Sequence, residues 1–138
     1  MDTPFFNDPL CFVWMAFQRL YPDKKCKVAY DAGITDDDGK RVYGLTTFCN
    51  DGEIFVTIDA GQAVCNAVET LAHELAHVAV GPEGDHGEKW KVAFDAIYDE
   101  YVKIGNEIIQ DCEFVKVEVI GETVKVKERG GEDGEKAD

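Results

Sequence analysis

The length, composition and charge of this chain indicate an ordinary globular protein and exclude several other classes. Its 138 residues, 45% of them hydrophobic and 30% charged, are enough for one domain with a buried core. No apolar run approaches the roughly 20 residues that cross a bilayer, so we expect no membrane partner. The net charge of -14 repels phosphate groups and argues against direct, tight binding to nucleic acid.

The N-terminus and the cysteines bear on where the protein works. The first residues, MDTPFFNDPL, carry two aspartates and no Lys or Arg, unlike a signal peptide, so we expect a cytoplasmic protein. The five cysteines are odd in number and scattered, and they form no C-x-x-C pair. We interpret them as buried free thiols rather than as a disulfide framework or a zinc ribbon.

The N-terminal third predicts a helix, a short strand and a polar loop. Asp8 is the predicted N-cap of the helix, and Pro9 is at its first helical position. The helix ends before Pro22. A strand over residues 25–30 follows. The three aspartates at 36–38 lack the later glycine and glutamate of a calcium-binding EF-hand loop, so they predict a solvated turn.

The next segment predicts an antiparallel hairpin. Two strand-like runs, residues 41–48 and 53–58, are separated by a turn that contains Asp51 and Gly52. An Asp-Gly pair supplies the positive φ angles of a tight hairpin turn. The free edge of this hairpin has two interpretations: it pairs with an extended peptide through main-chain hydrogen bonds, or it is purely structural.

The central predicted helix covers about residues 62–80 and has two different faces. One face carries an apolar stripe formed by Val64, Val68, Leu71, Leu75 and Val78. His73 and His77 lie two positions beyond two of these residues, which at about 100° per residue places them on nearly the opposite side. A Gly-Pro pair at 81–82 then stops the helix.

A second long helix is predicted from about Glu88, where apolar residues again recur at helical spacing. Residues 114–120 and 123–126 predict a C-terminal hairpin. The last segment consists mainly of Gly, Glu, Asp and Lys and cannot contribute to a core. We therefore expect a single domain over residues 1–127 and an acidic disordered tail over 128–138.

All three histidines of the chain lie in one stretch. His73, Glu74 and His77 form H-E-x-x-H, and the two imidazoles can bind one metal ion because residues four apart lie on one helix face. A catalytic zinc takes three protein ligands and keeps one position for water. His86 is the natural third ligand, because a loop with a reach of about 15 Å can return it to the metal. Three carboxylates are weaker alternatives: Glu83, Asp85 and Glu100.

Glu74 is expected to handle a proton rather than to bind the metal. Bound zinc lowers the pKa of its water to about 7, and a nearby carboxylate takes the proton as hydroxide attacks a peptide carbonyl. The protonated Glu74 then passes this proton to the leaving nitrogen. Three residues remain open as groups that stabilise the oxyanion: Tyr43, Tyr98 and Tyr101. The motif thus predicts a zinc-dependent endopeptidase with a protein or peptide substrate.

The stretch HELAHVAV followed by DHGEKW resembles the SprT-like metallopeptidases, whose pattern is H-E-x-x-H, a short loop and H-G-x-x-F/W. Here the second half of the pattern is His86, Gly87 and Trp90, and the likeness covers about residues 43–101. The resemblance implies zinc on the three histidines, Glu74 as the catalytic acid/base, and a zincin-like α+β fold. With the predicted elements, that fold comprises an N-terminal helix, a small antiparallel sheet, and the H-E-x-x-H helix packed with a second long helix.

The SprT-like family includes the Spartan group, which cleaves proteins crosslinked to DNA. This chain differs from that group because it has no cysteine pairs for a zinc ribbon and its tail is acidic rather than basic. These differences argue against a DNA-linked role.

Two functions other than hydrolysis stay open. One is a non-enzymatic binding module in which zinc stabilises the fold and an acidic surface contacts a basic protein partner. The other is an acidic phosphate mimic that occupies a nucleic-acid-binding protein. Catalytic activity separates both from a peptidase.

Overall fold

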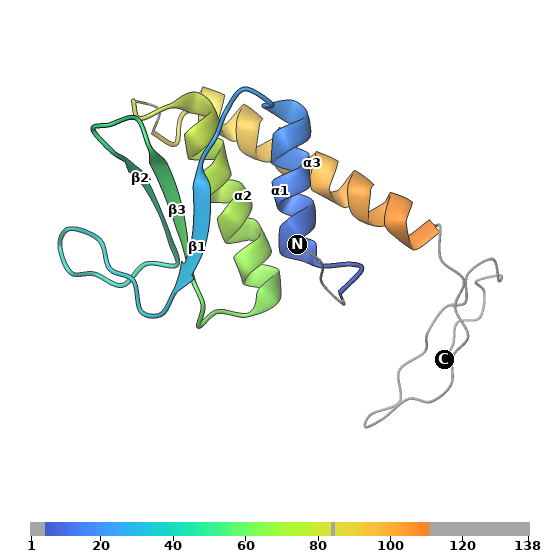
Figure 1. Ribbon diagram of the computed structural model, residues 1–138, viewed down its shortest axis with the longest axis horizontal. Helices are drawn as coiled ribbons and strands as arrows, with labels where there is room; N and C mark the ends of the chain where they lie inside the picture. Colours follow the sequence, from blue (N-terminus) through green and yellow to red (C-terminus); the bar gives the residue numbers. More distant parts are fainter. Residues whose placement is uncertain (1–4, 84, 111–138) are drawn as a thin grey trace.

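The computed structural model describes residues 5–83 and 85–110. In this part of the chain it contains three helices and a three-stranded sheet, which confirms the α+β class (Figure 1). The elements are, in chain order, α1 (Pro9–Leu20), β1 (Lys27–Asp31), β2 (Gly44–Phe48), β3 (Ile54–Asp59), α2 (Val64–Val80) and α3 (Glu88–Gln110). The predicted C-terminal hairpin, the domain boundary at residue 127 and the acidic tail all lie outside the described residues.

The sheet is mixed, so the expectation of a purely antiparallel sheet is wrong. Strand β3 lies in the middle; β2 pairs with it antiparallel, and β1 pairs with it parallel (Figure 1). The β2–β3 hairpin was predicted correctly, and β3 lies between β1 and β2. The reason is burial: Val56 and Ile58 of β3 are buried, whereas every residue of β1 is exposed.

The three helices pack on one side of this sheet and on one another. Helix α2 packs against both β2 and β3, while α1 and α3 contact each other and α2. Their shared core is formed by fully buried side chains such as Phe17, Ile58, Leu75, Ile97 and Ile104. Burying each such side chain stabilises the fold by about 1.5–3 kcal/mol, so α2 is firmly held on its apolar face.

The apolar stripe of α2 is confirmed except at its first residue. Val68, Leu71, Leu75 and Val78 are buried, but Val64 is 57% exposed because it opens the helix, beyond the edge of the core. None of the described helices combines the length and the hydropathy of a membrane-spanning segment.

The four cysteines within the described residues are free, as expected, but only two of them are partly buried. Cys26 and Cys49 have intermediate exposure, whereas Cys11 and Cys65 are exposed, so their interpretation as buried thiols is wrong. Both exposed thiols lie on helix surfaces that face away from the core.

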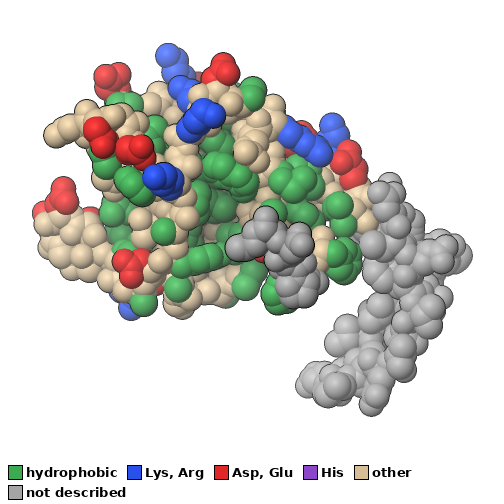
Figure 2. Space-filling model, in the orientation of Figure 1, with side chains coloured by type: hydrophobic (Ala, Val, Ile, Leu, Met, Phe, Trp, Pro, Cys, Tyr) green, Lys and Arg blue, Asp and Glu red, His purple; other side chains and the backbone are tan. Residues whose placement is uncertain are grey.

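Figure 2 shows one face of the molecule, on which hydrophobic side chains gather between α1 and β1. Trp14 of α1 and Val28 and Tyr30 of β1 line a hollow of about 400 Å³ there. Acidic and basic side chains surround this area (Figure 2). None of the three histidines lines this hollow, so the motif residues lie elsewhere.

Candidate metal centre

The structure brings the three predicted ligands together. Nε2 of His86 lies 3.0 Å from Nε2 of His73 and 3.1 Å from Nε2 of His77. His73 and His77 come from one face of α2, and His86 comes from the loop before α3. Gly81, with φ of +96°, ends α2 and allows the chain to turn back. The three side chains are therefore close enough to hold a metal ion.

The donor set fits a small divalent ion. Tetrahedral zinc with Zn–N bonds of 2.0–2.1 Å requires ligand nitrogens about 3.3 Å apart, close to the 3.0 and 3.1 Å that separate Nε2 of His86 from the other two nitrogens. The pKa of His73 is lowered to about 4, first by desolvation and then by the charges of His77 and His86. His73 is thus neutral near pH 7, which is the form that binds a metal.

The carboxylates that the sequence left as alternative ligands lie apart from this cluster. The group of potential ligands found among the described residues contains the three histidines and no acidic side chain. Glu100 forms an ion pair of 2.9 Å with Arg19 on α1. Asp85 and Glu83 line a different hollow beside the loop.

Trp90 supports the histidines, a role that sequence reasoning did not assign to it. Its Nε1 donates a hydrogen bond of 3.1 Å to the backbone oxygen of His73. Its ring centroid lies 4.7 Å from that of His73, 5.8 Å from that of His77 and 4.8 Å from that of His86. One side chain on α3 therefore contacts all three imidazoles and links α3 to α2. Its position four residues after His86 was the available signal.

Glu74 lies beside the histidines and is only 7% exposed. Thr46 on β2 donates a hydrogen bond to its Oε1, with 2.6 Å between the oxygens, and Thr46 Oγ1 also lies 3.2 Å from its backbone oxygen. Desolvation raises the pKa of Glu74, while the Thr46 hydrogen bond and the charge of His86 oppose that rise. A carboxylate with a raised pKa is a better proton acceptor near neutral pH.

Gly44, the first residue of β2, allows this strand to approach α2 closely. A Cβ atom at this position would lie 2.5 Å from Thr70 Cγ2 and 2.9 Å from Glu74 Oε2. Contacts of this length do not occur between real side chains, so any larger residue would displace the strand or the helix. Sequence patterns could not predict this contact, because Gly44 is far along the chain from Thr70 and Glu74.

A hollow of about 350 Å³ opens beside His73 and Glu74. Its other lining residues come from β2, α2, α3 and the segment before β2, namely Tyr43, Gly44, Glu69, Thr70 and Phe94. We call it the cleft. Of the three tyrosines considered for oxyanion stabilisation, only Tyr43 lines it; Tyr98 and Tyr101 continue an aromatic stack along α3 beyond Phe94. Tyr43 is therefore the tyrosine placed to contact a molecule in the cleft.

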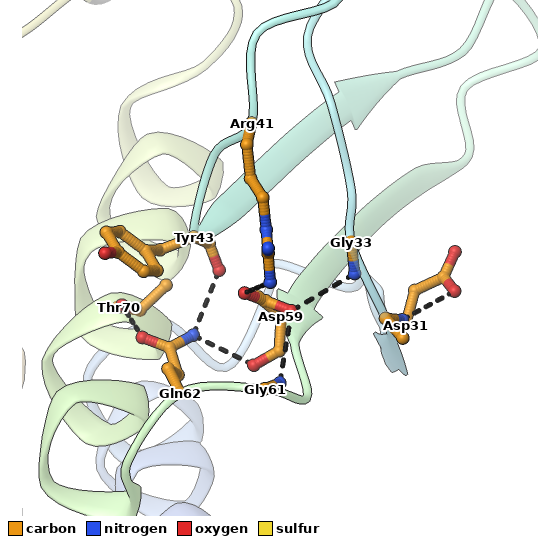
Figure 3. A network of polar contacts seen from close by, with 9 residues as sticks. Asp31, Gly33, Arg41, Tyr43, Asp59, Gly61, Gln62 and Thr70 are labelled. Carbon is orange, nitrogen blue, oxygen red and sulfur yellow. Dashed lines mark hydrogen bonds and ion pairs between the residues drawn. The ribbon is translucent and has the colours of Figure 1, made fainter.

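The loop that carries Tyr43 is anchored by the buried carboxylate of Asp59 (Figure 3). Asp59 Oδ1 accepts hydrogen bonds from the backbone nitrogens of Gly61, at 3.1 Å, and Gly33, at 3.3 Å. Arg41 donates to Oδ2 at 3.2 Å. The hydrogen bond from Gly61, followed by those from Gly33 and Arg41, lowers the pKa of Asp59 despite its burial.

Gln62 joins this anchor to the cleft (Figure 3). Its Nε2 donates to the backbone oxygens of Tyr43 and Asp59, both at 3.1 Å, and its Oε1 accepts from Thr70 Oγ1 at 3.0 Å. Two lining residues of the cleft, Tyr43 and Thr70, are thereby tied to one side chain. Sequence reasoning assigned no function to Gln62.

Comparisons of the chain with models of protein families, with curated proteins and with solved structures found no match. The resemblance to SprT-like metallopeptidases therefore stays a prediction from the two motif halves. What the protein does must be argued from the residues of the site.

Proposed function

We propose that this protein is a zinc-dependent endopeptidase of SprT-like, zincin type, with the metal on His73, His77 and His86 and with Glu74 as its general acid/base. One observation carries the proposal: Nε2 of His86 lies about 3 Å from Nε2 of both His73 and His77, and the nearly buried Glu74 lies between these two histidines in the sequence of α2. An adjoining cleft lined by His73 and Glu74 adds support, because an active site needs space for its substrate beside the reacting groups.

The residues of the chain have distinct roles in this proposal. When bound, zinc supplies Lewis acidity, which activates a water molecule and polarises a peptide carbonyl. Glu74 accepts a proton from the attacking water and returns it to the leaving amide nitrogen. Thr46 holds one oxygen of Glu74, so that the carboxylate does not rotate away between these two transfers. Trp90 keeps the His73 ring in place through the backbone of that residue.

The position of β2 suits an extended peptide substrate. This strand lies at one edge of the sheet, and it carries both Gly44, at the cleft, and Thr46, in contact with Glu74. A peptide that pairs with this edge through main-chain hydrogen bonds would run past the general base regardless of its sequence. This supports hydrolysis of a protein or peptide in an extended conformation.

Metal analysis combined with a peptidase assay tests the proposal. Purified protein should contain one zinc per chain and cleave an unfolded protein such as reduced casein. Glu74→Gln should keep the zinc and lower the cleavage rate by about 100-fold or more, because a positioned general base contributes 10²–10⁴-fold. His86→Ala should lose the zinc; an unchanged zinc content would transfer the third ligand to another residue.

The same assay decides against the non-enzymatic alternatives. The non-enzymatic alternatives are a zinc-stabilised binding module and a phosphate mimic. Each would bind a basic protein partner, which the net charge of -14 favours. Such proteins would bind the partner equally well with Glu74→Gln and would cleave nothing. Zinc-loaded wild-type protein that cleaves no peptide would therefore contradict the endopeptidase.

A further inference from the structure

The cleft beside His73 is lined by acidic and aromatic side chains. Its charged lining residues are Glu69 and Glu74, and no lysine or arginine lines it among the residues that the structure describes. Glu74 accepts a hydrogen bond from Thr46 and is the proposed general acid/base. Glu69 is exposed, and within the described part of the chain no donor or cation is bonded to its carboxylate.

Glu69 lies one helical turn before His73 on α2. Residues four apart in a helix share a face, so this carboxylate is on the same side as the histidine. A substrate whose scissile bond is at the metal site would place a neighbouring side chain, one or two residues away, within reach of Glu69. The Glu69 carboxylate therefore lines the same cleft as His73 but is separate from the proposed catalytic carboxylate of Glu74.

Two aromatic rings complete the cleft. Tyr43 precedes β2 and is 65% exposed, but its backbone is fixed by Gln62. Phe94 on α3 stacks on Trp90 with ring centroids 5.3 Å apart, and Trp90 is bonded to His73. The Phe94 ring and the backbone of Tyr43 are therefore held in position before a ligand arrives, which lowers the entropic cost of binding.

We propose that this cleft is a subsite for a lysine or arginine side chain of the substrate, with Glu69 as its counter-charge. The aliphatic stem of such a side chain packs against Tyr43 and Phe94, and its cation meets the carboxylate and the ring faces. Acidic side chains are repelled by the same carboxylate. The inference rests on the proposed peptidase function for the nature of the ligand, and it adds a preference that the metal centre alone does not impose.

Paired peptides measure this preference. Each pair is identical except that one member has lysine and the other has norleucine, an uncharged side chain of nearly the same shape, at each of six successive positions. At one position, wild-type protein should cleave the lysine peptide with a kcat/KM about tenfold higher, as expected from one cation–π contact and one exposed ion pair. Glu69→Gln should reduce this ratio to near one, and Glu69→Lys should favour a glutamate peptide instead.

A matched control separates the local charge from the overall charge. Glu107→Gln removes the same charge from an exposed position near the C-terminal end of α3, far along this helix from the cleft residue Phe94. It should therefore leave the ratio unchanged. Cleavage of the norleucine peptide should stay within about twofold in Glu107→Gln, because this residue does not line the cleft. A lysine preference that survives Glu69→Gln, or that Glu107→Gln removes as well, overturns the proposal.

Binding measurements keep this proposal separate from the proposed function. Calorimetry with zinc-loaded Glu74→Gln protein and the same peptides should show a similar affinity ratio, which the double variant Glu69→Gln/Glu74→Gln loses. If the wild-type protein cleaves no peptide, the peptidase fails, yet a Glu69-dependent affinity for lysine peptides would still establish the subsite. Equal affinity for lysine and norleucine peptides would overturn the subsite.

Discussion

Thr46 on the edge strand holds Oε1 of Glu74 on the central helix at 2.6 Å, across 28 residues of sequence. This hydrogen bond links the strand that would receive a peptide to the group that would transfer its protons. Both residues are partly or nearly fully buried, so water cannot readily replace the bond. Four predictions concern this bond and the contacts around it.

The first prediction concerns Thr46. Thr46→Val keeps the shape of the side chain but removes the hydroxyl, so the carboxylate of Glu74 loses its support. A hydrogen bond to a charged group contributes about 1.5–3 kcal/mol, so kcat should fall by roughly 10- to 100-fold while KM changes little. Thr46→Ser should restore most of the rate. Equal kcat for the valine and serine variants would show that the hydroxyl only stabilises the fold.

The second prediction concerns the close approach at Gly44. Gly44→Ala places a methyl group against Thr70 and Glu74, and this overpacking should destabilise the protein by about 1–3 kcal/mol. Chemical denaturation measures the loss. The double variant Gly44→Ala/Thr70→Ser removes Cγ2, the nearest clashing atom, and keeps the hydroxyl that donates to Gln62. It should recover part of the stability; no recovery would place the strain elsewhere.

The third prediction concerns Trp90. Trp90→Phe retains an aromatic ring over the histidines but removes the Nε1 donor to the backbone of His73. Supporting contacts around metal ligands typically contribute 10–100-fold to metal affinity, so zinc affinity should fall by about that factor. Competition with a chromophoric chelator measures it. Phe94→Leu, which leaves the hydrogen bond intact, is the control; an equal loss there would assign the effect to ring packing.

The fourth prediction concerns the stability of the metal-free protein against pH. The pKa of His73 is about 4 in the folded protein and 6.5 in its ordinary state, so between these values the unfolded chain binds more protons. Stability should therefore fall as the pH drops from about 6.5 towards 4. Urea unfolding at pH 7 and pH 5 measures the difference. His73→Gln should show a smaller decrease, and an identical decrease would attribute it to other groups.

The sequence predicted the parts of the site that depend on local spacing. His73 and His77 follow from the helical period, and the Gly-Pro pair at 81–82 explains why His86 can return to them. The helices and the β2–β3 hairpin were found in the same way, with bounds shifted by up to three residues. Local patterns suffice here because each depends on neighbours within one or two turns.

The features that the sequence did not predict depend on how distant segments pack. The insertion of β3 between β1 and β2 is decided by which strand gains most from burial, and not by chain order. The contact between Thr46 and Glu74 requires a particular register of β2 against α2. Val64 fits the helical stripe but lies past the end of the core. Each outcome is tertiary, so no periodicity in the chain reveals it.

The buried carboxylate of Asp59 has a consequence for how the cleft behaves without a ligand. It fastens the segment before β2 to the end of β3, and Gln62 extends that fastening to Tyr43 and Thr70. The wall of the cleft is therefore assembled in advance, and its shape should be nearly the same in the empty and the occupied protein. Recognition then resembles a rigid slot rather than a closing lid.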